Sequence, residues 1–167
     1  MSTALVTPQH TITALVQNET GTINRLVSLF RRRGFSIACF NAGDCEQPGY
    51  SRITLVVNGS EDEMRQCVRQ LEKLIDVVEA EDLGDYERIS RELVLVKIDS
   101  GSTSQTEVEL RLAGFDAFVV AWGASAGVVQ ACVKPEQVES FLQALAPASI
   151  LEIVRTGAVA IKASDLN

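Results

Sequence analysis

The first half of the chain changes between two hydrophobic periods. Residues 10–17 alternate β-branched and other side chains, a period of two that predicts a half-buried strand. Residues 21–33 instead place apolar side chains at positions 23, 26, 27 and 30, the spacing of one helical face. Two more strands are predicted over 35–45 and 50–58, because Pro48-Gly49 between them favours a tight reversal.

A second helix and a fourth strand complete this first pattern. Ser60 followed by Glu63 is typical of a capping box, in which each side chain satisfies an open backbone N–H at the helix start. The helix behind it buries one face, made of Met64, Cys67, Val68, Leu71 and Leu74. Residues 74–83 then predict a strand. The order βαββαβ predicts a four-stranded antiparallel sheet covered by two helices.

The same order of elements begins again after a short polar joint at 84–88. Strands are predicted over 93–98, 115–122, 127–133 and 150–154, and helices over 104–113 and from Pro135 onward. We therefore expect an α+β protein of two tandem ferredoxin-like βαββαβ modules, over residues 10–83 and 90–160. Each module is small and leaves strand edges open, so we expect a homodimer that forms through the first module.

The loop from Asn18 to Gly21, between the first strand and the first helix, is the best candidate for a binding site. Gly21 can adopt backbone angles closed to other residues, and the first helical N–H groups behind it can receive a carboxylate. Asn18 offers two donors and an acceptor at the rim. The alternative is a plain strand-to-helix turn, and the loop alone does not decide between them.

Charge narrows the classes of partner. Fifteen Lys and Arg against 22 Asp and Glu give a net charge of −7, which disfavours nucleic acid and anionic membranes as partners. The basic run Arg31-Arg32-Arg33 falls in the last turn of a predicted helix, where cations favour the dipole. We interpret it as a helix cap; a phosphate-binding or acidic-partner patch is the alternative.

Cysteine use and the absence of targeting segments predict a reduced, cytoplasmic protein. The four cysteines have no metal-ligand spacing. Cys67 and Cys132 fall where small buried hydrophobes are expected, whereas Cys39 and Cys45 are close enough in sequence to pair in principle. Residues 1–9 lack the charged start and apolar block of a signal peptide, and no apolar run approaches the ~18 residues of a membrane span.

No convincing active site is evident in the sequence. His10 is the single histidine, and we interpret it as a polar residue at a strand end because no partner is evident that would orient its ring as a base. Asp99 with Glu107 are possible paired carboxylates, and the acidic run 79–82 is most simply a solvated surface. Neither a metal-ligand set nor a phosphate loop is present. We expect no catalytic residues, no metal site and no cofactor in this chain.

Four strings of residues carry a resemblance to a known family. They are Gln17-Asn18-Glu19-Thr20-Gly21, Arg33-Gly34-Phe35-Ser36-Ile37, Ser51-Arg52-Ile53-Thr54 and Arg91-Glu92-Leu93-Val94-Leu95-Val96-Lys97-Ile98. In this order they resemble the regulatory (small) subunit of acetohydroxyacid synthase, also called acetolactate synthase. The match covers residues 10–98 well, is weak over 99–150, and returns at 151–157.

The resemblance implies that residues 10–83 are an ACT domain, a fold that typically binds amino acids. It implies a non-catalytic subunit that binds and activates a catalytic chain, which itself carries thiamine diphosphate, FAD and magnesium. It also implies feedback inhibition by branched-chain amino acids, valine above all. Effector-binding positions carried over from the family are Asn18, Gly21, Thr22, Ile23, Ser36 and Ile37. The family pairs its ACT domains so that the loop of one chain meets strand and helix residues of the other.

Two departures from the family and two alternative functions remain. Position 36 commonly carries Asn in the family, and Ser36 has one hydroxyl in place of a two-ended amide, so effector binding should be weaker. Residues 99–113 are shorter and less charged than the family's helix there. The first alternative is a stand-alone amino-acid sensor, or an assembly subunit with a weakened effector site. An enzyme of the ferredoxin-like class is the second, and it lacks an acid/base set.

Overall fold

The computed structural model describes residues 8–84 and 86–163, which divide into two compact units. The first unit takes in the chain up to Ile89 and the stretch from Ala160, and the second unit is Ser90–Val159. Residues 1–7, where we expect no signal peptide, and Asp85 of the predicted joint lie outside the described residues. No described helix is both long and apolar enough to cross a membrane.

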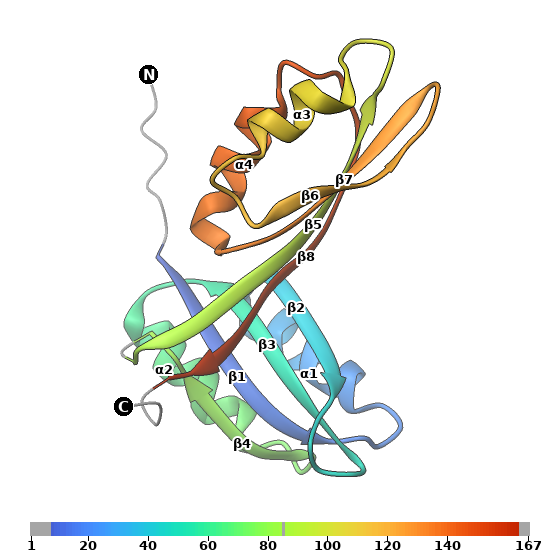
Figure 1. Ribbon diagram of the computed structural model, residues 1–167. Helices are drawn as coiled ribbons and strands as arrows, with labels where there is room; N and C mark the ends of the chain where they lie inside the picture. Colours follow the sequence, from blue (N-terminus) through green and yellow to red (C-terminus); the bar gives the residue numbers. More distant parts are fainter. Residues whose placement is uncertain (1–7, 85, 164–167) are drawn as a thin grey trace. The chain divides into compact units, whose positions relative to one another are not determined.

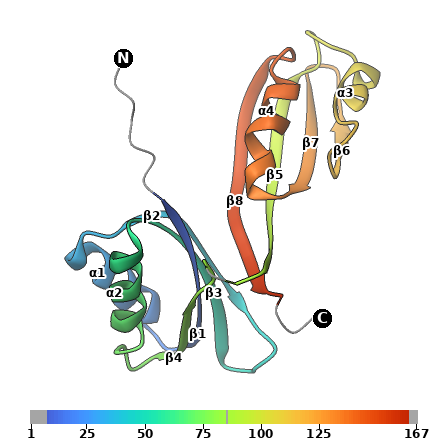
Figure 2. The same ribbon diagram turned by 90° about the vertical axis from the view of Figure 1, so that its left-hand side faces the viewer.

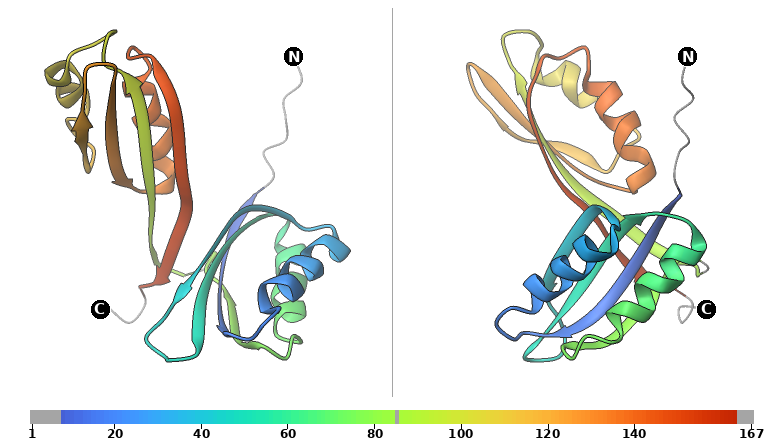
Figure 3. Two further views of the ribbon diagram at one scale, coloured as in Figure 1. Left: turned by 90° about the vertical axis from the view of Figure 1, so that its right-hand side faces the viewer. Right: turned by 180° about the vertical axis from the view of Figure 1, so that it is seen from behind.

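The first unit has the predicted βαββαβ order. Its elements are β1 (Gln9–Gln17), α1 (Thr22–Arg33), β2 (Ser36–Asp44), β3 (Tyr50–Asn58), α2 (Glu61–Leu71) and β4 (Val77–Asp82). The strands pair antiparallel in the order β2-β3-β1-β4, so β2 and β4 form the edges of the sheet. Both helices cover the same face of this sheet (Figures 2 and 3).

Register and helical period together place one apolar layer between the sheet and its helices. Pairs such as Ile12 with Leu55 and Ala14 with Ile53 turn alternate side chains of β1 and β3 to the same face. From the helices come Leu26, Leu29, Phe30, Met64, Cys67 and Leu71, each at most 5% exposed. Fully burying one such large side chain contributes about 1.5–3 kcal/mol. The predicted helical face is therefore confirmed at Met64, Cys67 and Leu71.

Both helix ends predicted in the first unit are present. Ser60 Oγ accepts the N–H of Glu63 at 3.4 Å, and Glu63 Oε2 accepts the N–H of Ser60 at 2.7 Å, which lowers the pKa of Glu63. Helix α1 is capped at its C-terminus by Gly34, whose φ of 72° lies in the left-handed region that favours glycine. Arg31, Arg32 and Arg33 form the last turn of the helix. The predicted position of the basic run in the last turn of the helix is thus confirmed.

The start of the fourth strand was predicted too early. Leu74 does not begin β4; its N–H donates to the carbonyl of Leu71, and Val77 N–H donates to the carbonyl of Leu74. These bonds continue the end of α2 as a turn, so the strand begins only at Val77. Leu74 still packs against the core, half-buried, which is why its apolar side chain suggested a strand.

The second unit repeats the topology, with β5 and β8 longer than predicted and β6 shorter than the predicted 115–122. Its elements are β5 (Arg88–Asp99), α3 (Gln105–Arg111), β6 (Ala117–Trp122), β7 (Ala126–Val133), a 3₁₀ turn η1 (Pro135–Gln137), α4 (Val138–Leu145) and β8 (Ile150–Lys162). The sheet order is β6-β7-β5-β8, with both helices on one face (Figure 1). The strands predicted over 93–98 and 150–154 were too short, because β5 and β8 continue through polar residues.

The cysteines are free thiols, but their burial differs. Cys67 is fully buried, and desolvation raises the pKa of its thiol to about 12. Cys132 is half-buried rather than buried, which corrects the prediction, because it alternates with the core residues Ala131 and Val133 and so lies on the opposite face of β7. Cys39 and Cys45, which were close enough in sequence to pair, both remain half-exposed thiols.

A buried carboxylate and a partly exposed guanidinium form an ion pair between β5 and β8. The side chain of Glu92 on β5 is only 4% exposed, and its Oε1 accepts a hydrogen bond from Arg155 Nε on β8 at 2.6 Å. Arg155 Nη1 also lies 3.4 Å from Glu139 on α4. These carboxylates, Glu92 foremost, raise the pKa of the Arg155 guanidinium. Next to it, Thr156 Oγ1 accepts the N–H of Leu93 at 3.1 Å. The pair therefore fixes β8 to β5 and to α4.

We predict that Arg155→Ala destabilises the protein by about 2–4 kcal/mol, because it leaves the buried carboxylate of Glu92 without a partner. Arg91→Ala is the matched control, since the Arg91 guanidinium is exposed and donates to the carbonyl of Ser90. Urea unfolding of the full chain measures both. Equal losses of stability in the two variants would contradict a structural role for the Glu92–Arg155 pair.

Candidate functional site

The loop between β1 and α1 has the backbone conformation that its glycine permits. Gly21 is the N-cap of α1, with φ at 91° and ψ at −1°. A Cβ built on Gly21 would lie 3.2 Å from Nη1 of Arg25, so the guanidinium sits close over the glycine. The close approach predicted at Gly21 is therefore made by a cation of the same chain.

The start of α1 differs from the starts of α2 and α3. Helices α2 and α3 each have a capping box, whereas α1 has no side-chain cap and no acidic residue in its first turn. The N–H of Thr22 donates to the carbonyl of Glu19 at 3.1 Å. Within residues 8–84 and 86–163, the N–H groups of Ile23 and Asn24 have no acceptor. Open N–H groups at a helix start are suited to an anion.

Asn18 ties the loop to the β2–β3 hairpin. Its Nδ2 donates to Asp44 Oδ1 at 3.3 Å, its Oδ1 accepts from Ser51 Oγ at 2.5 Å, and its backbone N–H donates to the carbonyl of Gly49 at 2.9 Å. We predicted that this amide offers two donors and an acceptor at the rim. In the structure one N–H and one lone pair of the amide remain for a ligand.

Thr22 and Arg25 connect the loop to a buried carboxylate that the sequence analysis missed. Thr22 is 4% exposed; its Oγ1 donates to the carbonyl of Gln17 at 3.1 Å and accepts from Arg25 Nη2 at 3.4 Å. Arg25 Nε forms an ion pair with Asp76, whose side chain is only 7% exposed. The position of Asp76 between Ile75 and Val77 was the available signal, since a buried carboxylate needs a partner.

A cavity of about 280 Å³ opens at this loop. Its lining combines the apolar side chain of Ile23 with the polar groups of the loop; the other lining residues are Val16, Gln17, Asn18, Glu19, Thr20, Thr22 and Ser51. Ile23 is 42% exposed. A small ligand with one apolar end and one anionic end fits such a surface.

The structure places the predicted effector residues in two groups. Asn18, Gly21, Thr22 and Ile23 lie together at the start of α1, but Ser36 and Ile37 begin β2. Ser36 pairs with Asn58 of β3, whereas Asn18 contacts Ser51, seven residues earlier. That separation is roughly 24 Å at about 3.4 Å per residue. A single chain therefore does not bring the two groups together.

His10 has the partner that sequence reasoning did not find. Its Nδ1 lies 3.1 Å from Oδ2 of Asp82, the last residue of β4. Glu81 forms an ion pair with Lys162 at 2.5 Å. The acidic run 79–82 is thus not a plain solvated surface, because two of its carboxylates are paired. The pairings join residues 72 and 81 positions apart, which a sequence motif does not reveal.

The other carboxylates considered earlier have local structural roles. Oδ1 of Asp99 accepts the N–H of Gly101 at 2.9 Å. Glu107 completes the capping box of α3 with Ser104, whose N–H lowers the pKa of Glu107. Across the described part of the chain, no group of three or more His, Cys, Asp or Glu side chains is placed to hold a metal ion.

Comparison with known proteins covers both units. Residues 12–79 match the family described as AHAS small subunit-like ACT domain, and residues 91–164 match the small subunit of acetolactate synthase. The acetolactate synthase small subunit of Mycolicibacterium smegmatis is 35% identical over 93% of this chain and 91% of its own. That of Bacillus subtilis is 36% identical over 89% and 87%. The crystal structure of the small subunit from Thermotoga maritima has a TM-score of 0.84, with 29% identity, over 93% of this chain and 97% of its own.

We predict that Gly21→Asp abolishes amino-acid binding at the loop. Its carboxylate would repel a ligand carboxylate by about 1–4 kcal/mol at about 4 Å and would compete for the guanidinium of Arg25. The positive φ adds a backbone cost of about 1–2 kcal/mol for any L-residue. Gly21→Ala is therefore the control, since it carries the same strain without the charge. Calorimetric titration with valine measures both variants, and wild-type affinity in Gly21→Asp would place the site elsewhere.

Proposed function

The chain belongs to the family of acetolactate synthase small subunits, and we propose that it is the non-catalytic regulatory subunit of that enzyme. In this proposal it binds and activates the catalytic subunit and mediates feedback inhibition by a branched-chain amino acid, with valine as the first candidate. The catalytic partner would carry the thiamine diphosphate, FAD and magnesium that the reaction needs. The proposal places the complex in the cytoplasm.

The uncapped start of α1 is the observation that carries the effector part of the proposal. The N–H groups of Ile23 and Asn24 are open, and the guanidinium of Arg25 lies beside them, so an amino-acid carboxylate has donors and a nearby positive charge. Ile23, which is 42% exposed, offers apolar surface for a short branched side chain. The acceptors that remain for the ammonium are few within one chain, which favours a contribution from a second copy.

The edge strand β2 supports a homodimer that would complete this site. Pairing of β2 with β2 of a second copy around a two-fold axis is antiparallel, so the start of one strand lies opposite the end of the other. Ser36 and Ile37 of the second copy would then approach Asp44, which already contacts Asn18. The two groups of predicted effector residues would meet across the dimer, as the family arrangement implies.

The catalytic part of the proposal is tested by reconstitution with the catalytic subunit from the same organism. We expect the purified chain alone to form no acetolactate from pyruvate, and we expect it to raise the rate of the catalytic subunit. Turnover of pyruvate by the chain alone would contradict a regulatory role. Amino-acid binding without any effect on the catalytic subunit would instead favour a stand-alone sensor.

The departure at position 36 generates a prediction about affinity. A lost hydrogen bond to a charged group costs roughly 1.5–3 kcal/mol, or about ten- to a hundred-fold in affinity. We expect wild-type protein to bind valine weakly and Ser36→Asn to bind it more tightly by that factor, with the preference between leucine and valine unchanged. Ser36→Ala is the control, because it removes the hydroxyl without adding an amide. Titrations at the same salt and pH compare the three, and equal affinities would show that position 36 does not contact the ligand.

A further inference from the structure

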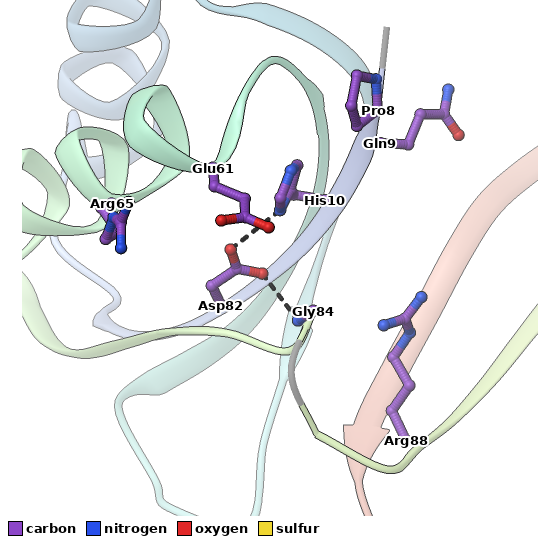
Figure 4. A pocket seen from close by; sticks show the side chains of 8 residues that line it. All are labelled: Pro8, Gln9, His10, Glu61, Arg65, Asp82, Gly84 and Arg88. Atoms are coloured by element: carbon purple, nitrogen blue, oxygen red, sulfur yellow. Dashed lines mark hydrogen bonds and ion pairs between the residues drawn. The ribbon is translucent and has the colours of Figure 1, made fainter. Parts of the chain in front are cut away.

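A second pocket, of about 310 Å³, lies in the first unit near the first residues of β1, the end of β4 and the start of α2. It is distinct from the loop cavity, with which it shares no lining residue. Its walls carry both signs of charge: Glu61 and Asp82 are acidic, Arg65 and Arg88 are basic, and His10 lies among them (Figure 4).

The centre of the pocket is a fixed His–Asp pair. Both oxygens of Asp82 are engaged, Oδ2 with His10 Nδ1 at 3.1 Å and Oδ1 with the N–H of Gly84 at 2.9 Å. A Cβ on Gly84 would lie 3.2 Å from Asp82 Oδ1 and 3.6 Å from His10 Nδ1, so the glycine packs close against the pair. Since a carboxylate only accepts, Nδ1 carries the hydrogen of this contact, and in that tautomer Nε2 is left as an acceptor.

Glu61 provides an unused negative charge next to this pair. Throughout the residues that the structure describes, its carboxylate has no hydrogen-bond or ion-pair partner. Its position at the first residue of α2 favours a carboxylate through the helix dipole. Figure 4 shows the carboxylate of Glu61 beside His10 and Asp82. An ammonium group placed here would meet Glu61 and Nε2 of His10 as acceptors.

Arg88 provides the opposite charge across the pocket. Its Nη1 donates to the carbonyl of Leu83 at 3.0 Å, which uses one of the five N–H donors of the guanidinium. In Figure 4 it lies on the other side of Gly84 from Glu61, His10 and Asp82. Arg65, by contrast, is already engaged with Asp62 at 2.5 Å. The remaining donors of Arg88 are suited to a carboxylate.

We propose that this pocket binds a small hydrophilic zwitterion of the α-amino acid class, with its carboxylate at Arg88 and its ammonium at Glu61 and His10. Pro8, Gln9 and Gly84 complete the lining, so that apart from Pro8 and Gly84 every lining side chain is polar or charged. The pocket therefore suits a polar side chain, unlike the loop cavity with the exposed Ile23. The proposal does not depend on the effector role of the loop.

The test uses L-serine as the probe on the full chain, measured by calorimetry at millimolar ligand. Ethanolamine lacks the carboxylate of serine, and 3-hydroxypropionate lacks its ammonium. We expect serine to bind. Each analogue should bind at least about ten-fold more weakly, because it lacks one hydrogen-bonded charged group. No binding of serine, or equal binding of either analogue, would overturn the proposal.

Single-residue variants test whether serine binds in this pocket. We expect Glu61→Gln and Arg88→Gln each to lower the affinity for serine by about ten-fold or more. Glu72→Gln, an exposed carboxylate at the other end of α2, should leave the affinity unchanged. Gly21→Asp should also leave it unchanged, and that separates this site from the loop. Serine binding that is lost in Gly21→Asp and kept in Glu61→Gln would assign serine to the loop and refute the second site.

Discussion

The buried carboxylate of Asp76 is the constraint on which the loop site depends. It lies between the end of α2 and the start of β4, and Arg25 of α1 is the cation that compensates it. The backbone carbonyl of the same residue accepts the N–H of Gln17 at the end of β1. One residue thus fixes the strand before the loop and the helix after it. The guanidinium that neutralises Asp76 also covers Gly21, so the charge near the helix start is set by the core and not by the loop.

The two units have one topology but different helix starts. In the second unit Ser104 and Glu107 close the N-terminus of α3 with reciprocal hydrogen bonds, and Thr103 adds a third to Glu107. The corresponding helix of the first unit has no such cap. The two units therefore share a fold but not a site. In the second unit the helix start is capped by its own side chains, whereas in the first unit it is open to an anion.

Local patterns in the sequence predicted most of the fold, and long-range pairs account for most of what was missed. Hydrophobic period identified the buried faces at Met64 and Phe141, and three-residue spacing identified the cap at Ser60. The strand β8 was predicted too short because two polar residues, Arg155 and Thr156, and then Gly157 interrupt the apolar pattern. In the structure all three continue the strand, with Gly157 at a positive φ. Arg25 with Asp76, and His10 with Asp82, are partners that only the folded sheet brings together.

The edge position of β2 has a consequence for how a regulatory signal would depend on the amount of protein. In the proposed dimer, an effector held by residues from both ends of the paired strands would bind the dimer and not the separated chains. By linkage the same effector then favours association, and its apparent affinity falls when the protein is diluted. In the proposed dimer, binding of an amino acid and association of subunits would thus be a single equilibrium, and a cell would change its sensitivity to the amino acid whenever it changed how much of this chain it makes.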